Sequence, residues 1–226
     1  QMLNGYDIAG RQDFRVRALV TELIGQRSTS PDVVVLGSSR ALLVGEALLG
    51  MSGVSNHSVS SARLVHYMSV LGLYQQRGML PQVVLIGVDP WIFKDERLVI
   101  WPMEEGAYAV AERLHIDITR LGIANAVQWQ GYFSGDKAWK SVSAMGNVQG
   151  NCGTDIPLHG DASACAVRRH DGSLKYPADE MARSAESVAK EVLRSARGRM
   201  HSYDGYRELD LNKIQALRHF LGYLQA

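Results

Sequence analysis

The sequence lacks the features that tie a chain to a disulfide-rich scaffold, a nucleic acid or a membrane span. It has two cysteines in 226 residues, too few for a dense disulfide framework. Its 24 Lys and Arg residues nearly balance its 23 Asp and Glu residues, so no global field would draw it to nucleic acid or an anionic membrane. No apolar run approaches the roughly 18–20 residues of a membrane span. These absences leave a globular domain with no nucleic-acid partner.

The remaining composition suits one α/β domain. Hydrophobic residues make up 46% of the chain and charged residues 21%, which argues against global disorder. A domain of this length buries roughly 70% of its unfolded surface. We expect a single domain over residues 1–226, incomplete at both ends. Residue 1 is Gln with no signal peptide following it, and the amphipathic helix predicted over 210–226 stops without a terminating signal.

Short β-branched runs predict a parallel sheet. Residues 33–36 (VVVL) and 83–86 (VVLI) each follow a proline within two residues and end at a glycine, and residues 54–56 form a shorter candidate strand. Unalternated runs of this kind are typical of strands buried on both faces. Helical patterns over 14–24 and 62–77 separate them. The order predicts right-handed βαβ units and a three-layer α/β/α sandwich with a parallel sheet.

The second half of the chain is less regular. We read about residues 92–175 as an insertion with helical parts near 107–122, and 178–200 as a further helix.

Ligands bind outside the carboxyl ends of strands in open parallel sheets, which selects three loops: 37–40, 56–61 and 87–90. The first holds Ser38 and Ser39 directly after Gly37. A hydroxyl there would lie near N–H groups that bind an anion or an oxyanion. The residues alone favour a simpler role, in which one serine caps the following helix.

Three blocks at these loops resemble the SGNH (GDSL-like) hydrolase superfamily. They are Gly37-Ser38-Ser39-Arg40, Asn56-x-x-Val-x-Ser61-Ala62 and Gly87-Val88-Asp89-Pro90-Trp91. The likeness is greatest to its bacterial extracytoplasmic Gly-Ser-Ser branch, which includes proteins of lipoteichoic-acid D-alanylation and relatives of alginate O-acetylation proteins. Residues 169–177 (RHDGSLKYP) resemble a further segment of that branch.

The resemblance implies a serine esterase or O-acyltransferase of a cell-envelope glycan or polymer. Ser39 would be the nucleophile that forms an acyl-enzyme. Ser38, Arg40, Asn56, Ser61 and Asp89 would line the oxyanion and substrate region. The implied location is the periplasm or cell envelope, with any membrane anchor in a missing N-terminus. The implied partner is an acylated glycan or polymer, and the oligomeric state is open.

Two positions depart from the family pattern. Ser61 stands where block two has glycine, and Asp89 stands where block three has asparagine. An ionised carboxylate cannot donate a hydrogen bond to an oxyanion. Either Asp89 is protonated, or Arg40 or Asn56 supplies the donor, or the oxyanion hole is weak; a turn-forming role for Asp89 is the alternative.

The catalytic base is also missing from this sequence. The superfamily takes it from a late Asp-x-x-His block, yet none of the seven histidines (57, 66, 115, 159, 170, 201 and 219) follows an aspartate by three residues. We therefore expect the His and Asp beyond Ala226, and little activity from this chain alone. The alternative function is a noncatalytic SGNH-like module that binds or scaffolds envelope polysaccharide machinery. A third reading is a cytoplasmic flavodoxin-like protein that binds a phosphate or flavin at residues 37–39.

The two cysteines offer one structural candidate. Cys152 and Cys165 would form a disulfide in an exported protein, with two free thiols as the fallback. Together with His159 and His170 their spacing matches no strong zinc pattern. We expect no metal and no cofactor.

Overall fold

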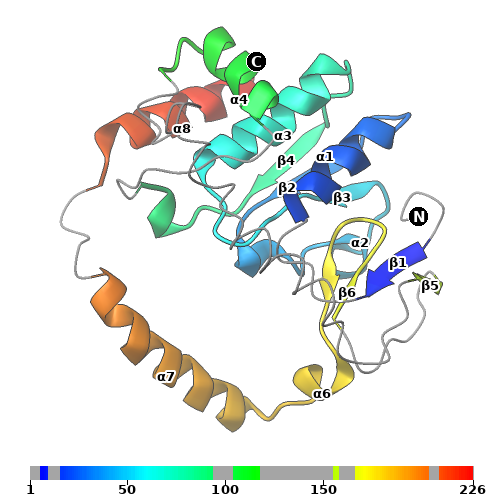
Figure 1. Cartoon of the computed structure of the whole chain (residues 1–226), viewed down its shortest axis with the longest axis vertical. Helices are drawn as coiled ribbons and strands as arrows, with labels where there is room; N and C mark the ends of the chain where they lie inside the picture. The colour runs from blue at the N-terminus through cyan, green and yellow to red at the C-terminus, as the bar shows by residue number, and fades with distance from the viewer. Residues whose placement is uncertain are drawn as a thin grey trace, which may run out of the picture.

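The first apolar run forms the centre of a parallel sheet. In the computed structural model, β2 (Val33–Leu36) lies between β3 (Val54–Asn56) and β4 (Val83–Ile86) and pairs in parallel with both. The structure describes residues 6–9, 16–93, 104–117, 155–157, 166–203 and 209–225. All three predicted strands are confirmed with their predicted bounds (Figure 1).

The order β3-β2-β4 makes β2 a switch point. The chain leaves β2 toward β3 through the 3₁₀ turn η2 (Ser39–Ala41) and α2 (Glu46–Leu49), then crosses back through α3 (Leu64–Gln76) to reach β4 on the other side. Where successive connections lead to opposite sides of one strand, a crevice forms at the carboxyl ends of the strands. The candidate serines follow this strand.

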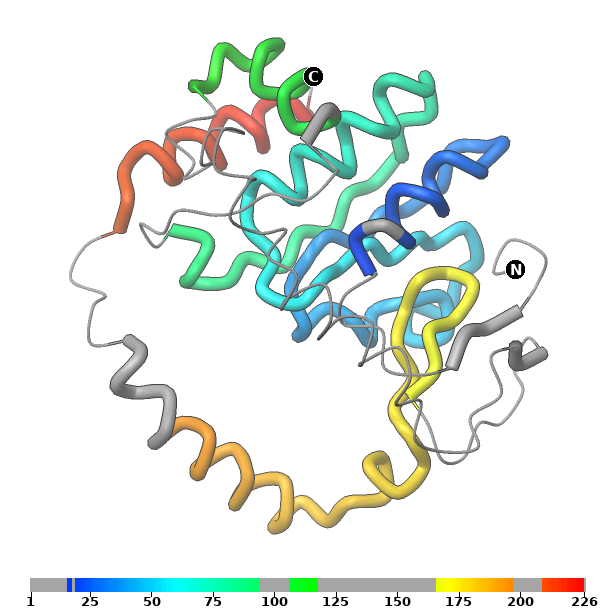
Figure 2. The backbone as a smooth tube through the Cα atoms, in the orientation of Figure 1, coloured from blue at the N-terminus to red at the C-terminus, as the bar shows by residue number. Residues whose placement is uncertain are grey.

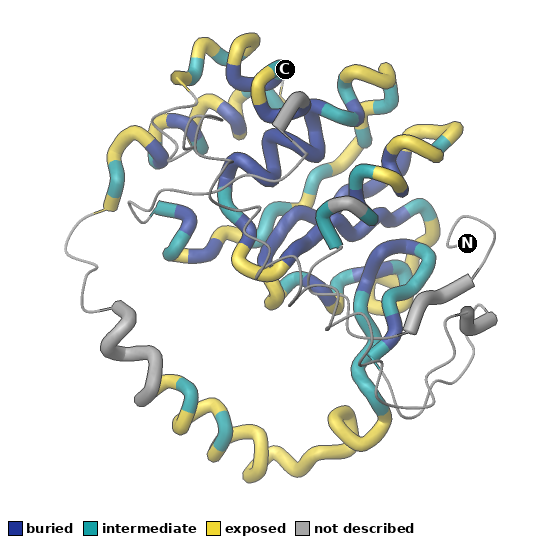
Figure 3. Tube along the Cα trace, in the orientation of Figure 1, coloured by how far each residue is buried: buried dark blue, intermediate teal, exposed yellow. Residues whose placement is uncertain are grey.

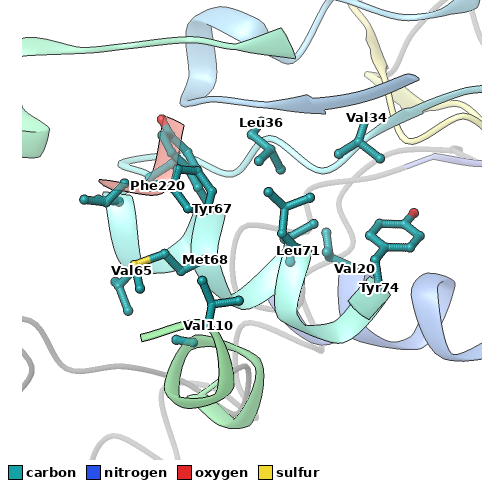
Figure 4. Packing of buried hydrophobic residues seen from close by; sticks show 14 of the residues in the cluster. Val20, Val34, Leu36, Val65, Tyr67, Met68, Leu71, Tyr74, Val110 and Phe220 are labelled. Carbon is teal, nitrogen blue, oxygen red and sulfur yellow. The ribbon is translucent and has the colours of Figure 1, made fainter. Parts of the chain in front are cut away.

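One face of the sheet carries the main core. Its helices are α1 (Val16–Gln26), α3, α4 (Glu104–Arg113) and α8 (Leu211–Gln225). Val34 and Leu36 of β2 share one buried cluster with residues of these four helices. Figure 4 shows the side chains of Val34 and Leu36 directed toward Leu71 of α3. Burial of this face is the largest apolar contribution visible in the fold.

Helices α3 and α4 cross at a pair of glycines. A Cβ on Gly72 would clash with the backbone of Gly106, and a Cβ on Gly106 would clash with the backbone of Ser69. The absence of side chains therefore permits the close approach of the two helices.

The opposite face is covered only in part within the described residues. Val33, Val35 and Val54 are buried beneath Ala41 and Val44. On the neighbouring strand β4, by contrast, residues 83 and 85 on this face are 47% and 38% exposed. The chain thus has an α/β fold with helices packed on one face of a three-stranded parallel sheet.

A second, antiparallel sheet was not anticipated from the sequence. Its strand order is β5-β1-β6-β7, comprising β1 (Tyr6–Ala9), β5 (Asp155–Pro157), β6 (Val167–Arg168) and β7 (Leu174–Lys175). None of these four segments is an unbroken β-branched run of the kind that marks β2 and β4. The β6–β7 hairpin falls inside the predicted irregular insertion.

The predicted helices are present with shifted bounds. The helix predicted over 178–200 is divided into α6 (Ala178–Met181) and α7 (Ala185–Tyr203), which lie along the lower edge of Figure 2, away from the sheet. Residues 118–122 of the helix predicted near 107–122 lie outside the described residues, as do Cys152 and Cys165. In the described ranges no helix is both long and apolar enough to cross a membrane.

Candidate functional site at the carboxyl ends of the parallel strands

The three loops selected from the sequence meet around Gly37. A Cβ at Gly37 would clash with Ala41 and would lie 3.3 Å from Ser58 Oγ and 3.7 Å from Gly87 Cα. The Val59 amide donates to the Gly37 carbonyl at 3.1 Å, which joins the loop after β3 to the loop after β2. Only glycine allows the backbones to approach this closely. The structure therefore brings the predicted site loops together at one edge of the sheet.

The two adjacent serines have different environments. Ser38 is buried, and its Oγ accepts a hydrogen bond from the Arg40 amide at 3.4 Å, so it caps η2. Ser39 is exposed at the first position of η2. The capping role thus belongs to Ser38, whereas Ser39 is exposed and its side chain has no hydrogen bond with the residues that the structure describes.

An ion pair flanks the exposed serine. The Arg40 guanidinium pairs with the buried carboxylate of Asp89 and lies 4.8 Å from the centre of the Trp91 ring. The Arg40 side chain is 63% exposed. A guanidinium has five N–H donors in a fixed fork, whereas a carboxylate only accepts. At this position the hydrogen-bond donor toward solvent is therefore Arg40, which Asp89 and the indole ring orient.

Asn56 is fully buried beneath the same loop. Its Nδ2 donates to the carbonyls of Ala41 at 2.7 Å and Val44 at 2.6 Å, and its Oδ1 accepts from the Ser58 amide at 2.8 Å. These bonds occupy both N–H groups of the side chain. Asn56 therefore lies at the loops selected from the sequence, but its side chain binds backbone carbonyls and holds the segment after Ser39 in position.

The β6–β7 hairpin adds a residue that sequence reasoning missed. The carboxylate of Asp171 accepts from the Glu46 amide at 2.7 Å and from the Ser173 amide at 2.8 Å. The Asp171 carbonyl accepts from the Asn56 amide at 2.6 Å. The pair Asp171-Gly172 is a turn signal, but nothing in the sequence identifies a partner more than a hundred residues earlier.

Glycine is required at the next position of that hairpin. Gly172 has φ of +80°, and a Cβ there would clash with the carbonyl of Asn56. The hairpin therefore presses its backbone directly against the residue that braces the Ser39 loop. A further backbone bond, from the Leu174 amide to the Leu42 carbonyl at 2.7 Å, continues this contact.

Ser61 lies exposed in the loop after β3 with φ of +56°. This left-handed conformation favours glycine and costs a residue with a Cβ about 1 kcal/mol. The backbone thus explains why a glycine would suit this position.

The histidines nearest to the site are structural. The Nε2 of His57 lies 2.7 Å from the Tyr74 hydroxyl, and burial, together with Arg27 and Arg168, lowers the pKa of His57 to about 3. Burial, together mainly with Arg17, lowers the pKa of His66 to about 3 as well. Both imidazoles are therefore neutral at pH 7. Within the described part of the chain, Ser39 has no hydrogen bond to a histidine.

Metal ligands do not gather in the described ranges, which hold no group of three or more His, Cys, Asp or Glu side chains arranged to bind an ion. Of the four residues whose spacing matches no strong zinc pattern, Cys152, His159 and Cys165 lie outside those ranges. His170 instead places its Nε2 3.0 Å from Glu46 Oε2.

Comparison with known proteins identifies no relative: no protein family, no curated protein and no solved structure matches the chain.

Proposed function

We propose that the chain is the nucleophile-bearing part of an SGNH-type serine esterase or O-acyltransferase that acts on a cell-envelope glycan or polymer. Ser39 gives its hydroxyl proton to a base and attacks the ester carbonyl; the ester C–O bond breaks, the alcohol leaves with a proton, and the acyl group remains on Ser39 until water or an acceptor hydroxyl takes it. The exposed position of Ser39 after the switch-point strand β2, beside a buried serine that takes the capping role, is the observation that carries this proposal.

The surrounding geometry supports an anionic transition state at Ser39. The family pattern has an asparagine donor where this chain has Asp89. Arg40, held by Asp89 and Trp91, supplies N–H donors in its place. This arrangement favours Arg40 over Asn56 as the donor, because the side-chain N–H groups of Asn56 already donate to the carbonyls of Ala41 and Val44. Preoriented donors stabilise a developing oxyanion more than mobile ones do.

The proposed complete fold is the three-layer α/β/α sandwich. The order β3-β2-β4 equals the first three strands of the flavodoxin-like order 2-1-3-4-5. The exposed outer side of β4 is the surface that a further layer would cover. Envelope localisation and the polymer substrate belong to the same proposal and rest on the resemblance of the three blocks.

Labelling with a fluorophosphonate probe tests the nucleophile. The probe is applied to the 226-residue chain and to the chain translated to its stop codon, and the labelled peptide is mapped. We expect label on Ser39, stronger in any form that contains the base. Ser39→Ala removes it, and Ser52→Ala, at another exposed serine, retains it. Arg40→Ala slows labelling about 10²-fold if its N–H groups stabilise the oxyanion.

The alternative is a noncatalytic SGNH-like module that binds an envelope polysaccharide. The lack of a histidine bonded to Ser39 among the described residues favours it, because an unactivated serine is a weak nucleophile. Folded protein that takes no label in either form, yet binds an acylated envelope polysaccharide, would replace the enzyme proposal with this one.

A further inference from the structure

Helix α7 (Ala185–Tyr203) has an apolar side that no described residue covers. Val188, Val192 and Leu193 are 43%, 58% and 60% exposed. At 100° per residue they fall within an arc of about 140°, together with three alanines at 185, 189 and 196. Figure 3 shows the described part of the helix largely exposed, and Figure 1 shows it apart from the parallel sheet.

The helix is well formed although no described residue covers its apolar side. Ser184 begins it: its Oγ accepts from the Ser187 amide at 3.2 Å, and its carbonyl accepts from the Val188 amide at 3.0 Å. Glu191 and Arg194 form an exposed ion pair one turn apart, with 2.7 Å between Oε2 and the guanidinium. An amphipathic helix of 19 residues is about 28 Å long, enough to lie across a surface.

The segment around α7 also concentrates positive charge. Lys190 and Arg194 lie one turn apart and outside the apolar arc, and Arg197 follows Lys190 by seven residues in the sequence. At 100° per residue the position of Arg199 falls within the arc, beyond its last alanine at 196. Residues 183–203 contain five Lys and Arg and two Glu, a net charge of +3. The rest of the chain then has 19 basic and 21 acidic residues, a net charge of −2. The near-neutral total conceals a local cationic region.

We propose that α7 lies flat on an anionic lipid bilayer, with its apolar side in the interface and its cationic residues near the headgroups. An aliphatic side and a cationic side on one helix are the combination that interfacial helices use. The helix is about 10 Å across, so even a cation on the side away from the bilayer lies within about one Debye length of the lipid charges at 0.1 M salt. A second copy of α7 is disfavoured as the partner, because two segments of charge +3 would repel each other.

Vesicle flotation of the 226-residue chain tests this proposal. We expect the chain to float with vesicles of phosphatidylcholine and phosphatidylglycerol, to stay behind with phosphatidylcholine alone, and to dissociate as salt is raised. The double variant Val192→Glu, Leu193→Gln lowers the bound fraction at least about tenfold. The double variant Lys190→Glu, Arg194→Glu removes the preference for anionic lipid. Leu211→Glu, at a leucine of α8 that is 71% exposed, binds like the parent chain.

Three results would overturn the proposal. One is absence of the chain from the floating fraction at low salt with anionic vesicles. Another is equal binding by the Val192→Glu, Leu193→Gln variant, with thermal unfolding monitored by circular dichroism to show that each variant is folded. The third is a dimer in light scattering that this variant dissociates while vesicles capture nothing, because that result assigns the apolar side to a second copy.

Discussion

Replacing Asp171 with alanine should loosen the loop that carries Ser39. The carboxylate of Asp171 accepts two backbone hydrogen bonds, from Glu46 at the start of α2 and from Ser173 in its own hairpin. Asp171 is buried, at 4% exposure, so its removal leaves those two amides without an acceptor. A hydrogen bond to a charged group contributes about 1.5–3 kcal/mol. Taking the lower value because Glu46 is only half-buried, we expect a loss of about 3 kcal/mol.

Chemical denaturation and thermal unfolding measure this loss. For a chain of this length, about 3 kcal/mol corresponds to a fall in Tm of about 6–12 °C. Asp171→Asn should lose roughly half as much, since its amide oxygen can still accept one of the two bonds. Hydrogen exchange should accelerate at the amides of Glu46 and Ser173, and at Asn56, whose amide donates to the Asp171 carbonyl.

The matched control is Asp179→Ala, which removes an exposed aspartate of α6 and the same charge. Equal stabilities of Asp171→Ala and Asp179→Ala, within about 0.5 kcal/mol, would refute the reasoning. That result would mean that the hairpin does not hold α2 and the Ser39 loop in solution.

Three further outcomes can be measured by the same unfolding experiments. The pKa values of His57 and His66 are both about 3 in the folded chain and 6.5 in the unfolded chain. The unfolded state therefore binds the extra protons, and each histidine lowers stability by up to about 1.4 kcal/mol per unit as pH drops from 6.5 to 3. His57→Gln should remove about half of this histidine contribution to the slope, and an unchanged slope would contradict the burial of His57. Ser61→Gly should stabilise the chain by up to about 1 kcal/mol, because φ is positive there; a loss of stability would contradict that backbone conformation. Gly72→Ala should destabilise it by about 1–3 kcal/mol, since the methyl group meets the backbone of Gly106, and Gly25→Ala, with open space around it, serves as the control.

The parallel sheet could be predicted because its signal is local. Strands β2 and β4 are short β-branched runs bounded by turn residues, and burial of both faces of β2 leaves no alternation to misread. The loops at the carboxyl ends of these strands follow from chain order alone. Their meeting at Gly37 is therefore a consequence that the sequence already contains.

The braces of the site could not be predicted because their signals are long-range. The resemblance places Asn56 in the oxyanion and substrate region. Its side-chain amide instead donates to two carbonyls that lie 12 and 15 residues earlier. Asp171 lies in a segment where only a turn is readable. Hydrogen bonds between side chains and backbone groups leave no periodic pattern at either separation, so neither role can be read from the sequence.

The separation between Asn56 and Asp171 has a consequence for the order in which the chain is built. The strands of the parallel sheet are complete by Ile86, but the acceptor for the Asn56 amide is synthesised 85 residues later. Domains acquire structure as the chain emerges from its N-terminus, and contacts of long sequence separation close last. During synthesis the sheet can therefore exist while the Ser39 loop still lacks its brace. Rigidity of the candidate site becomes a late event, acquired when the β6–β7 hairpin docks.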